Sequence, residues 1–491
     1  MRRTTLLVSL LTAAALAASG LAGGGTASAD PPAVSAAPVE RGGPGVWSKL
    51  STGTVGTIHE ASLHRTADRV LHVVYPRSEP GNLGSLGHTA VRPNGTTASQ
   101  SSVLTPWSIV DATPAVVAGP DGGLRVLFGG QRSTVTGEPY NEGQMYHLTA
   151  PAAGTTWTLQ STTVGESHSA YASYGTAATT LADGTPIAAY PLTSTITWHV
   201  GVNDDPDRSF TVAGCCVYDL AMVRSGGEVW LAWYGNGGSA ATNGTFVRRI
   251  HPSLGPVLKA PGSSVGADSL QTGRVALAAR AGGGVYAAYC SGYPTCTSVR
   301  LWKVGAGGAA VVPGSGGAGT VGLGAAPGGR LWVAWGTDPG VVRAVRTDPT
   351  ATRFGAVRAV GAPAGHTRVY ALGVDGGTGR GDVVVNPGDG FWHTQVLAGL
   401  TLKASPTTWR AGRKRAVRFT VTDAGNRVAG ARVTVAGRAC TTGSLGTCRV
   451  VLPKRSRPGR KVVRATRTEY APATAVLKVK KAKKKKKKKR R

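Results

Sequence analysis

Short apolar segments alternate with turns rich in glycine and aspartate seven times between residues 58 and 385. In each repeat, a short first strand is followed by a tight turn and by a second strand that is almost wholly apolar. Asp-Gly and Gly-Gly turns are typical of hairpins because these residues tolerate positive φ. The predicted second strands cover residues 70–75, 124–128, 186–190, 229–233, 285–289, 331–335 and 382–386. Six of them end in an aromatic residue at the same register, whereas the seventh ends in Asn386.

The spacing of the repeats predicts the architecture. The second strands start 43 to 62 residues apart, which is the length of a four-stranded blade. One hairpin cannot bury its apolar face, but blades that stack around an axis can. The pattern therefore predicts an all-β fold, with a seven-bladed β-propeller over residues 45–400. A two-sheet sandwich and a β-helix are the alternatives, and repeats of this length argue against both.

A second internal similarity predicts how the ring closes. Residues 47–56 resemble residues 157–165, each segment begins with a tryptophan, and each precedes the first strand of a repeat. In a propeller this position belongs to the outermost strand of the preceding blade. No blade precedes Trp47. We therefore expect its segment to complete the last blade beside residues 391–397, which removes the free edges of the ring.

After residue 400 the composition changes to Lys, Arg, Val and Thr, with alternating strands predicted at residues 417–421 and 432–435. The turns in residues 422–443 and 470–474 resemble those of bacterial immunoglobulin-like and carboxypeptidase-regulatory-like modules. The resemblance implies a small immunoglobulin-like (Ig-like) β-sandwich over residues 401–479. Such modules usually serve as spacers on exported proteins.

Most of the net charge lies in this C-terminal part. Residues 401–491 carry +27 of the formal +31, because they hold 29 Lys and Arg but only two acids, Asp423 and Glu469. Residues 401–479 contribute +16 and residues 480–491 contribute +11. The last twelve residues have no core-forming side chain, which predicts a disordered poly-lysine tail. Disordered polycations bind anionic polymers through counterion release; a merely solubilising extension is the alternative.

The expected partners are anionic polymers of the cell envelope or acidic polysaccharides. Sequence-specific binding of nucleic acid is not expected, because the tail has no aromatic residue for stacking on bases. The candidate polyanion-binding residues are Arg413, Lys414, Arg415, Lys454, Arg455, Arg457, Lys480, Lys481, Lys483, Lys484, Lys485, Lys486, Lys487, Lys488, Lys489, Arg490 and Arg491.

The N-terminus has the features of a secretory signal peptide over residues 1–29, followed by a linker over residues 30–44. Arg2 and Arg3 precede an apolar stretch, and Ala27-Ser28-Ala29 forms a small-residue cleavage site. An ordinary N-terminal helix is the alternative. The two arginines do not decide between the Sec and Tat routes. No apolar run of spanning length is found later in the chain, so we expect a secreted monomer, associated noncovalently with the cell wall.

Six cysteines suit an oxidising compartment, and they occur as three local pairs: Cys215/Cys216, Cys290/Cys296 and Cys440/Cys448. We expect the second and third pairs to close short loops, with the third joining adjacent strands. For the first pair two interpretations remain open, a vicinal disulfide and two cysteines on opposite faces of a strand. A catalytic thiol is not expected, because only Asp219 lies nearby as a base.

The loops that follow the second strands are expected to gather on one face around the axis, here called the loop face. Several of these loops are long and polar, and loops on a rigid scaffold often carry function. The candidate ligand-binding residues are Arg77, Glu79, Asn82, Arg132, Glu138, Tyr140, Glu142, Asn236 and Tyr293. The aromatic residues at the strand ends are expected to pack between blades and not to form a sugar platform.

The repeats are distantly similar to those of sialidase-type (BNR) propellers. That resemblance implies a glycosidase with an arginine cluster for a substrate carboxylate and a Tyr/Glu nucleophilic pair; Arg77, Arg132, Glu138 and Tyr140 are the residues that fit. The Asp-box turn of those enzymes is absent, however. Residues 155–157 keep only its end.

No standard zinc-ligand spacing is present among the ten histidines, and no cofactor is expected. One acidic turn, with Asp204, Asp205 and Asp207, is a weak Ca²⁺ candidate. Two functions from different classes remain. The first is a noncatalytic secreted protein whose loop face binds a glycan or protein while its basic end docks on anionic polymers. The second is an exported sialidase-like glycoside hydrolase or another carbohydrate-active enzyme.

Overall fold

A computed structural model describes residues 42–110, 113–131, 144–165, 175–192, 194–203, 205–213, 217–236, 238–263, 275–292 and 296–482. The predicted signal peptide and residues 483–491 of the predicted tail lie outside this part of the chain. Every named element in it is a β-strand or a single 3-10 turn, so the all-β prediction is confirmed. No helix in these ranges is long and apolar enough to cross a membrane.

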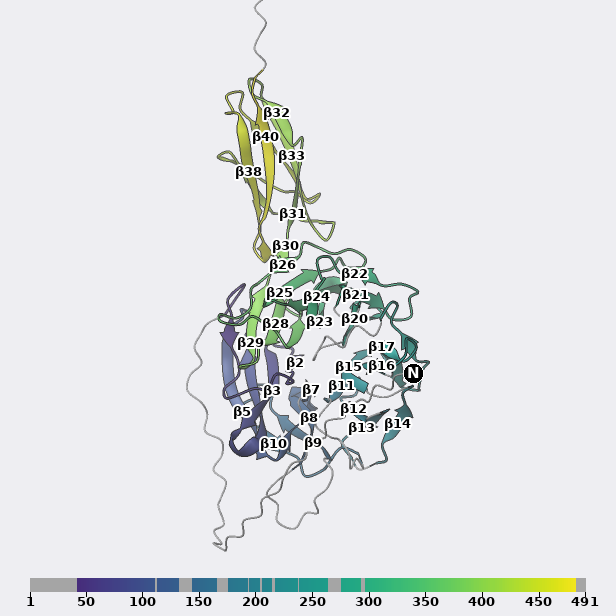
Figure 1. Cartoon of the computed structure of the whole chain (residues 1–491). Helices are drawn as coiled ribbons and strands as arrows, with labels where there is room; N and C mark the ends of the chain where they lie inside the picture. Colours follow the sequence, from purple (N-terminus) through teal and green to yellow (C-terminus); the bar gives the residue numbers. More distant parts are fainter. Residues whose placement is uncertain are drawn as a thin grey trace, which may run out of the picture. The chain divides into compact units, whose positions relative to one another are not determined.

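Seven sheets account for residues 48 to 396 of the described chain (Figure 1). The first contains β2 (Ser62–Arg65), β3 (Leu71–Glu79), β4 (Leu83–Val91) and β5 (Thr97–Trp107). The second contains β6 (Ile109–Val110), β7 (Ala115–Ala118), β8 (Leu124–Gln131), β9 (Gln144–Ala150) and β10 (Thr158–Leu159). The third contains β11 (Ala177–Thr180), β12 (Pro186–Leu192), β13 (Thr195–Val200) and β14 (Arg208–Thr211).

The remaining four follow the same order of strands. They are β15 (Val217–Ser225), β16 (Glu228–Asn236), β17 (Asn243–His251) and β18 (Leu258–Lys259); then β19 (Val275–Ala279), β20 (Val285–Ser291), β21 (Ser298–Lys303) and β22 (Ala310–Val311). Next come β23 (Ala318–Ala326), β24 (Arg330–Thr337), β25 (Val341–Arg346) and β26 (Arg358–Ala359). The last sheet holds β27 (Ala371–Asp375), β28 (Gly381–Asn386), β29 (Trp392–Val396) and the N-terminal β1 (Ser48–Lys49).

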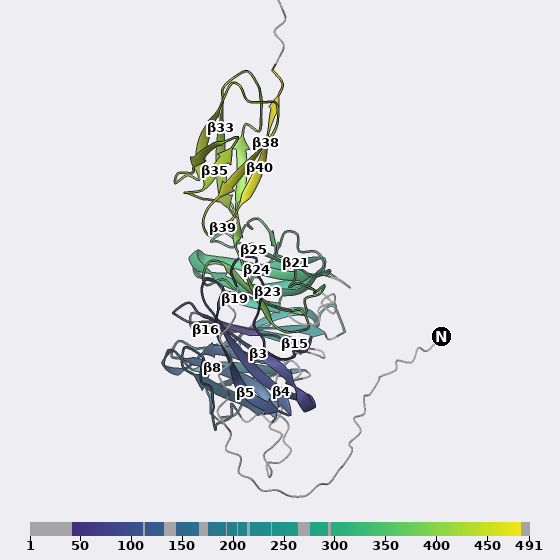
Figure 2. The same ribbon diagram turned by 90° about the vertical axis from the view of Figure 1, so that its left-hand side faces the viewer.

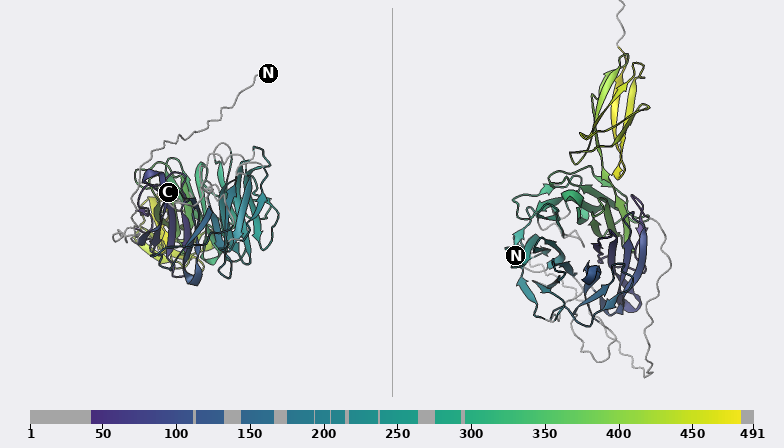
Figure 3. Two further views of the ribbon diagram at one scale, coloured as in Figure 1. Left: turned by 90° about the horizontal axis from the view of Figure 1, so that it is seen from below. Right: turned by 180° about the vertical axis from the view of Figure 1, so that it is seen from behind.

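The sheets form a ring. Strands β2, β7, β11, β15, β19, β23 and β27 contact one another in that order, and β27 contacts β2. Figure 3 shows the sheets arranged radially around a common centre. All seven predicted second strands are present, as β3, β8, β12, β16, β20, β24 and β28. The fold is therefore β-propeller-like.

The aromatic residues that end the second strands pack inside the ring of sheets. All six are buried, with at most 5% of the residue exposed. Trp233 contacts Phe210 and Phe246 with ring centroids 5.5 and 5.7 Å apart, and the Tyr75 hydroxyl donates to the Leu50 carbonyl at 3.0 Å. The prediction that these rings serve packing is confirmed.

Strand β1 closes the ring as predicted. Ser48 pairs with His393 and Lys49 with Trp392 on β29, and the Leu50 amide donates to the Phe391 carbonyl at 2.7 Å. The matching segment after Trp157 also has the predicted place, because β10 is the outermost strand of its sheet. Both strands cover what would otherwise be an unpaired edge.

Two buried polar networks stabilise the region where the ring closes. His72 and His88 lie side by side in the first sheet, with Nδ1 of His72 2.9 Å from Nε2 of His88. In the last sheet, Asp382 accepts hydrogen bonds from Arg65 at 2.6 Å and from Gln395 at 2.8 Å. Nε2 of His393 lies 3.0 Å from the same carboxylate, so this buried charge is paired and fully hydrogen-bonded.

Two further sheets form a C-terminal module with one shared core, and several of its strands, among them β33, β38 and β40, are labelled in Figures 1 and 2. One sheet contains β31 (Thr401–Ser405), β33 (Arg415–Asp423), β34 (Asn426–Arg427) and β37 (Thr447–Leu452). The other contains β32 (Thr408–Arg410), β40 (Ala473–Lys480), β38 (Gly459–Thr466), β35 (Arg432–Val435) and β36 (Arg438–Thr441). A short pair, β30 (Ala398–Gly399) with β39 (Tyr470–Ala471), lies at the start of the module.

Two details of the module differ from expectation. Cys440 and Cys448 are bonded, but they lie on β36 and β37, which belong to different sheets. The disulfide therefore joins the two layers and not adjacent strands of one sheet, because the chain crosses between the layers at this turn. Lys480, expected in the tail, is the last residue of β40 and pairs with Arg410.

Candidate functional site

Three of the predicted ligand-binding residues lie on one hairpin at the loop face. Arg77 and Glu79 end β3, and Asn82 lies in the connecting 3-10 turn Pro80–Asn82. This turn needs positive φ at two neighbouring positions, Gly81 at 78° and Asn82 at 60°. Glycine and asparagine are the residues that adopt this conformation most readily. The local sequence thus extends the hairpin beyond the sheet.

A cavity of about 240 Å³ lies against this hairpin. It is lined by His59, Pro76, Arg77, Ser78, Asn82, Leu83, Gly84, Ser108 and Val110. The lining comes from three places in the chain: the entry to the first sheet, the β3–β4 hairpin and the entry to the second sheet. Two of the predicted residues, Arg77 and Asn82, therefore lie together in one concave site.

The Arg77 guanidinium is held by hydroxyl groups. Its Nε donates to Ser85 Oγ at 3.0 Å, and its two terminal nitrogens donate to Thr52 Oγ1 at 3.3 Å and to Ser102 Oγ at 3.0 Å. These bonds use three of its five N–H donors. Two donors remain for a ligand, although the side chain is only 15% exposed.

The Glu79 carboxylate is bound by neighbouring protein groups, whereas the sequence predicts that it contacts a ligand. Its carboxylate accepts a short hydrogen bond from Ser85 and lies 3.5 Å from Nε of Arg77. It is not among the residues that line the cavity. Glu79 therefore serves to position Arg77 and Ser85, and the prediction that it faces a ligand is not supported by this geometry.

His59, which was not among the predicted site residues, is a wall of the cavity. Its Nδ1 accepts a hydrogen bond from the Gly56 amide at 3.1 Å, so a neutral ring carries its proton on Nε2. Burial lowers the pKa of His59 to about 4. The imidazole is therefore neutral at pH 7 and offers an N–H donor.

Asn386 holds the loop that carries His59. Its Nδ2 donates to the carbonyls of Gly56 and His59, at 2.8 and 2.9 Å. Asn386 is also the one residue that interrupts the aromatic register of the second strands. The departure from the repeat thus has a structural reason, and it is the signal in the sequence that could have pointed to this site.

The cavity can bind through donors more than through acceptors. Arg77, the neutral His59 and the Asn82 amide all supply N–H groups, whereas the Ser108 hydroxyl already donates to the Gln131 carbonyl at 2.8 Å and leaves only its oxygen as an acceptor. Such a set suits an anionic or hydroxyl-rich group. None of the described residues that line the cavity carries a carboxylate, so these residues do not form the paired acids of a glycosidase.

Of the other ligand candidates, the structure describes Asn236 alone, and this residue does not line the cavity. Asn236 ends β16 in a different sheet and pairs with Asn243. Arg132, Glu138, Tyr140, Glu142 and Tyr293 lie outside the described residues, as do Cys215 and Cys216.

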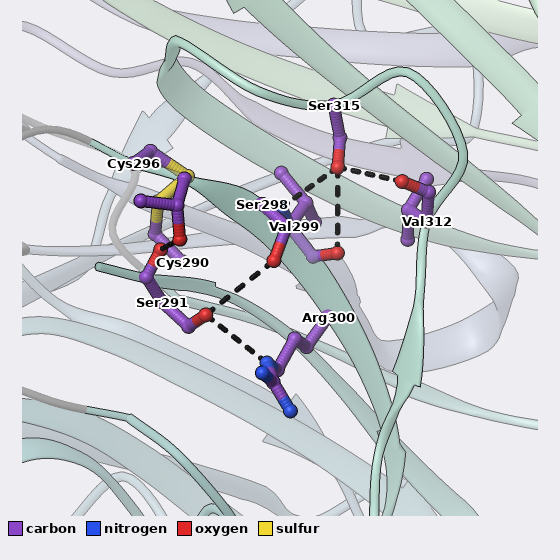
Figure 4. Close-up of a disulfide and its surroundings, with 9 residues drawn as sticks. Cys290, Ser291, Cys296, Ser298, Val299, Arg300, Val312 and Ser315 are labelled. Carbon is purple, nitrogen blue, oxygen red and sulfur yellow. Dashed lines mark hydrogen bonds between the residues drawn. A yellow bond between two sulfur atoms is a disulfide. The ribbon is translucent and has the colours of Figure 1, made fainter.

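The loop between β20 and β21 is closed by a disulfide, as predicted. Cys290 is bonded to Cys296 (Figure 4). Beside it, Ser291 Oγ accepts from Arg300 Nε at 3.0 Å. The disulfide and this hydrogen bond thus connect the end of β20 with the start of β21.

The acidic turn proposed for Ca²⁺ is occupied by protein groups. Asp207 accepts from the Tyr190 hydroxyl at 2.9 Å and lies 3.2 Å from Nδ1 of His199. Asp205 accepts from Asn203 at 2.5 Å. Asp204 is outside the described residues. Within the described ranges, no group of three or more His, Cys, Asp or Glu side chains could hold a metal ion.

The candidate polyanion-binding residues within the described ranges come together at one end of the C-terminal module, here called the basic end. The Gly412 amide donates to the Lys454 carbonyl at 3.1 Å, and the Ala411 amide donates to the Lys480 carbonyl at 2.9 Å. These bonds join the β32–β33 turn, the β37–β38 turn and the end of β40. The side chains exposed there are Arg413, Lys414, Arg415, Lys454, Arg455, Arg457, Lys480 and Lys481.

The only two acids of residues 401–491 do not weaken this charge. Asp423, which is 1% exposed, forms ion pairs with Arg330 and Arg346. Glu469 binds Arg380 through two hydrogen bonds of 2.5 and 2.6 Å. All three arginines belong to the propeller-like part of the chain. The exposed surface of the module away from these contacts is therefore purely cationic.

Comparisons with known proteins give structural similarities alone. No protein-family model matches the chain, and no curated protein matches it. Among solved structures, it is similar to a puromycin-hydrolysing peptidase from Mycobacterium tuberculosis, with 13% identity, a TM-score of 0.40 and coverage of 86% of this chain. The match covers 61% of that peptidase, so the chain spans about three fifths of its length.

Two glycosidases are also similar in structure. A β-xylosidase has 14% identity and a TM-score of 0.28, and the match covers 40% of this chain and 72% of that one. An α-L-arabinanase from Penicillium chrysogenum, solved with arabinobiose, has 12% identity and a TM-score of 0.39, with 61% and 94% covered. At these values the similarities carry no conclusion about activity. The β-propeller-like fold rests on the sheets and their ring.

Proposed function

We propose that this chain is an exported protein in which a seven-bladed β-propeller presents its loop face to a glycan, while an Ig-like module and a poly-lysine tail hold it on anionic polymers of the cell envelope. The observation that supports this proposal most directly is the basic end, where two turns and the start of the tail place eight exposed cations together. The seven sheets are the blades of this proposal, and the two-layered module is its Ig-like spacer.

The cavity beside Arg77 supports a glycan as the ligand of the loop face. Its donors come from Arg77, His59 and Asn82, and sugars with hydroxyl or carboxylate groups present acceptors to such donors. Small-molecule sites often combine a concave surface with a few convergent polar groups of this kind.

The catalytic alternative is an exported carbohydrate-active enzyme. Two of the three compared structures are named as carbohydrate-active enzymes, a β-xylosidase and an α-L-arabinanase. Hydrolysis of arabinan, xylosides or sialosides by the purified full chain decides between the two functions. Turnover by the native chain that disappears after heat denaturation would show that the chain is an enzyme and not a noncatalytic glycan-binding protein.

The anchoring function is tested by retention on cells. A chain that lacks residues 483–491, which leaves β40 intact, should be released at lower salt than the full chain, because fewer counterions are displaced on binding. A variant with Arg413, Lys414, Lys454 and Arg455 changed to Gln should also be released at a lower salt concentration than the unchanged full chain. Unchanged retention of both variants would contradict the anchoring function.

A further inference from the structure

The five-stranded sheet of the C-terminal module has a regular outer face. On β38 and β40, Val463, Ala465, Leu477 and Val479 point into the core and are at most 3% exposed. Side chains alternate along a strand, so the residues between them face outward. The exposed outward residues of this sheet include Arg410, Arg432, Arg460, Val462, Arg464, Thr474, Val476, Lys478 and Lys480.

Cations lie directly opposite cations on this face. Arg460 pairs with Lys478 across β38 and β40, and Arg410 pairs with Lys480 across β32 and β40. Like charges in opposite positions destabilise a sheet. The module cannot relieve this repulsion with its own acids, because Asp423 and Glu469 are already paired with arginines of the propeller-like part. An external anion can relieve it.

An apolar pair lies between the charged rows. Val462 pairs with Val476, and these side chains are 64% and 41% exposed. Arg464 lies on one side of Val462 along β38, and Arg460 lies on the other. None of the outward residues on β32, β35, β38 and β40 is aromatic, so the face offers no stacking platform for bases.

We propose that this face binds a polyol-phosphate polymer, in which phosphodiester charges alternate with short aliphatic linkers. The inference rests on the proposed anchoring function and names its partner class. The six cations that define the face are Arg410, Arg432, Arg460, Arg464, Lys478 and Lys480. Four of them are arginines, whose forked guanidinium binds phosphate oxygens in pairs.

The spacing of the face matches such a polymer. Outward residues recur along a strand every two residues, roughly 6.6 Å apart, and neighbouring strands lie about 4.8 Å apart. On β38, Arg460 and Arg464 are two outward positions apart, roughly 13 Å, because Val462 lies between them. This arrangement suits a partner whose charges are separated by uncharged linkers. Val462 and Val476 then contact the aliphatic linkers between phosphates, a role that a purely ionic partner would not require.

The opposite sheet of the same module supplies a matched control. Its outward face carries Lys403, Arg418 and Arg449, all exposed, with Arg418 paired to Arg449. Changing three cations to Gln on either face lowers the net charge by the same amount. A difference between the two variants therefore reports position and not charge alone.

The experiment measures binding of poly(glycerol phosphate) to the full chain at several salt concentrations. The variant R432Q/R460Q/R464Q should bind at least about tenfold more weakly, and its slope of log affinity against log salt should fall by about two, as expected for three lost phosphate contacts on a flexible polymer. The control K403Q/R418Q/R449Q should change affinity by less than about threefold. Equal losses in both variants would overturn the proposal.

Two further measurements define the partner and the role of the apolar pair. Polygalacturonate, a carboxylate polymer, should bind the wild-type chain more weakly than poly(glycerol phosphate) at equal charge concentration; equal affinity would overturn the phosphate assignment. V462S/V476S should weaken binding of poly(glycerol phosphate) without changing the salt slope. Thermal unfolding checks the fold of each variant, and removal of opposed like charges should not lower the melting temperature.

The outcome is separable from failure of the anchoring function itself. If the wild-type chain binds no anionic polymer, the anchoring function fails. If the wild-type chain binds and the R432Q/R460Q/R464Q variant binds equally well, the anchor lies in the basic end and the tail, and only the proposal for the sheet face fails.

Discussion

At the scale of single residues, the buried histidine pair makes the protein sensitive to acid. Burial lowers the pKa of His72 to about 4 and that of His88 to about 3. In the unfolded chain both would titrate near 6.5. Their neutral forms therefore stabilise the fold fully above pH 6.5, and this stability is lost as the pH falls from 6.5 towards 3, by up to about 1.4 kcal/mol per pH unit for each histidine.

Urea unfolding at pH 7 and pH 5 tests this prediction. His88→Gln should lose less stability between the two pH values than the wild type, because one titrating group is gone. Ser101→Ala is the control: it removes a hydrogen-bond partner of His88 and should lower stability at both pH values with the wild-type difference retained. An unchanged pH difference in His88→Gln would contradict the assignment.

Asn386 gives a second prediction at this scale. Asn386→Leu should cost about 1 to 3 kcal/mol of unfolding free energy, because the carbonyls of Gly56 and His59 lose their donor. The loop should also become more solvated, so the pKa of His59 should rise from about 4 towards 6.5. NMR titration of the imidazole measures the second effect, and a value that stays near 4 would show that other contacts hold the loop.

Residue-level chemistry was the part least accessible to sequence reasoning. Arg77 was predicted as a ligand contact from its loop position and from the resemblance to sialidase-type propellers. Its partners Ser85 and Ser102 lie on β4 and β5 of the same sheet, whereas Thr52 follows β1 and comes close only when the ring closes. Glu79 as a ligand contact stays a prediction; in the structure its carboxylate accepts from Ser85 on the facing strand of the hairpin.

At the scale of elements, the period of apolar and polar positions was sufficient for the strands. Hairpin turns and second strands depend on neighbouring residues, so each of the seven was predicted within a few residues. The place of β1 was predicted from a repeat of sequence, not from its own two residues. The layer of β36 was missed, because a four-residue strand does not reveal which sheet it joins.

The closing strand can be tested by comparing two aliphatic residues that flank it. Leu50 is 0% exposed and packs in the core between the first and last sheets, whereas Val46 is 46% exposed. Leu50→Ala should cost about 2 to 5 kcal/mol, and Val46→Ala less than about 0.5 kcal/mol. Chemical denaturation measures both. Similar costs for the two would show that this segment is not part of the cooperative core.

At the scale of the whole molecule, the two acids of the C-terminal residues differ in burial and should differ in effect. The Asp423 side chain is 1% exposed and forms ion pairs with Arg330 and Arg346. Asp423→Asn leaves both arginines without their carboxylate. It should cost about 3 kcal/mol or more. Glu469 is 51% exposed, and Glu469→Gln should cost less than about 1 kcal/mol.

Calorimetry of the full chain measures both variants. Asp423→Asn should lower the melting temperature of the transition that includes the C-terminal module, whereas Glu469→Gln should leave it within error of the wild type. Equal shifts would mean that the Asp423 pairs are as solvated as the Glu469 pair.

The pairing of β1 with β29 also has a consequence for the order of folding. Within each of the seven sheets, the other paired strands are close together along the chain, so their pairings can form as soon as their own residues are available. Ser48 must wait for His393, which lies near the far end of the propeller-like part. Contacts so distant in sequence form late and slow folding. Until then the last sheet keeps an open edge, and a chain that is cut before residue 390 has no partner for β1 and should aggregate through that edge.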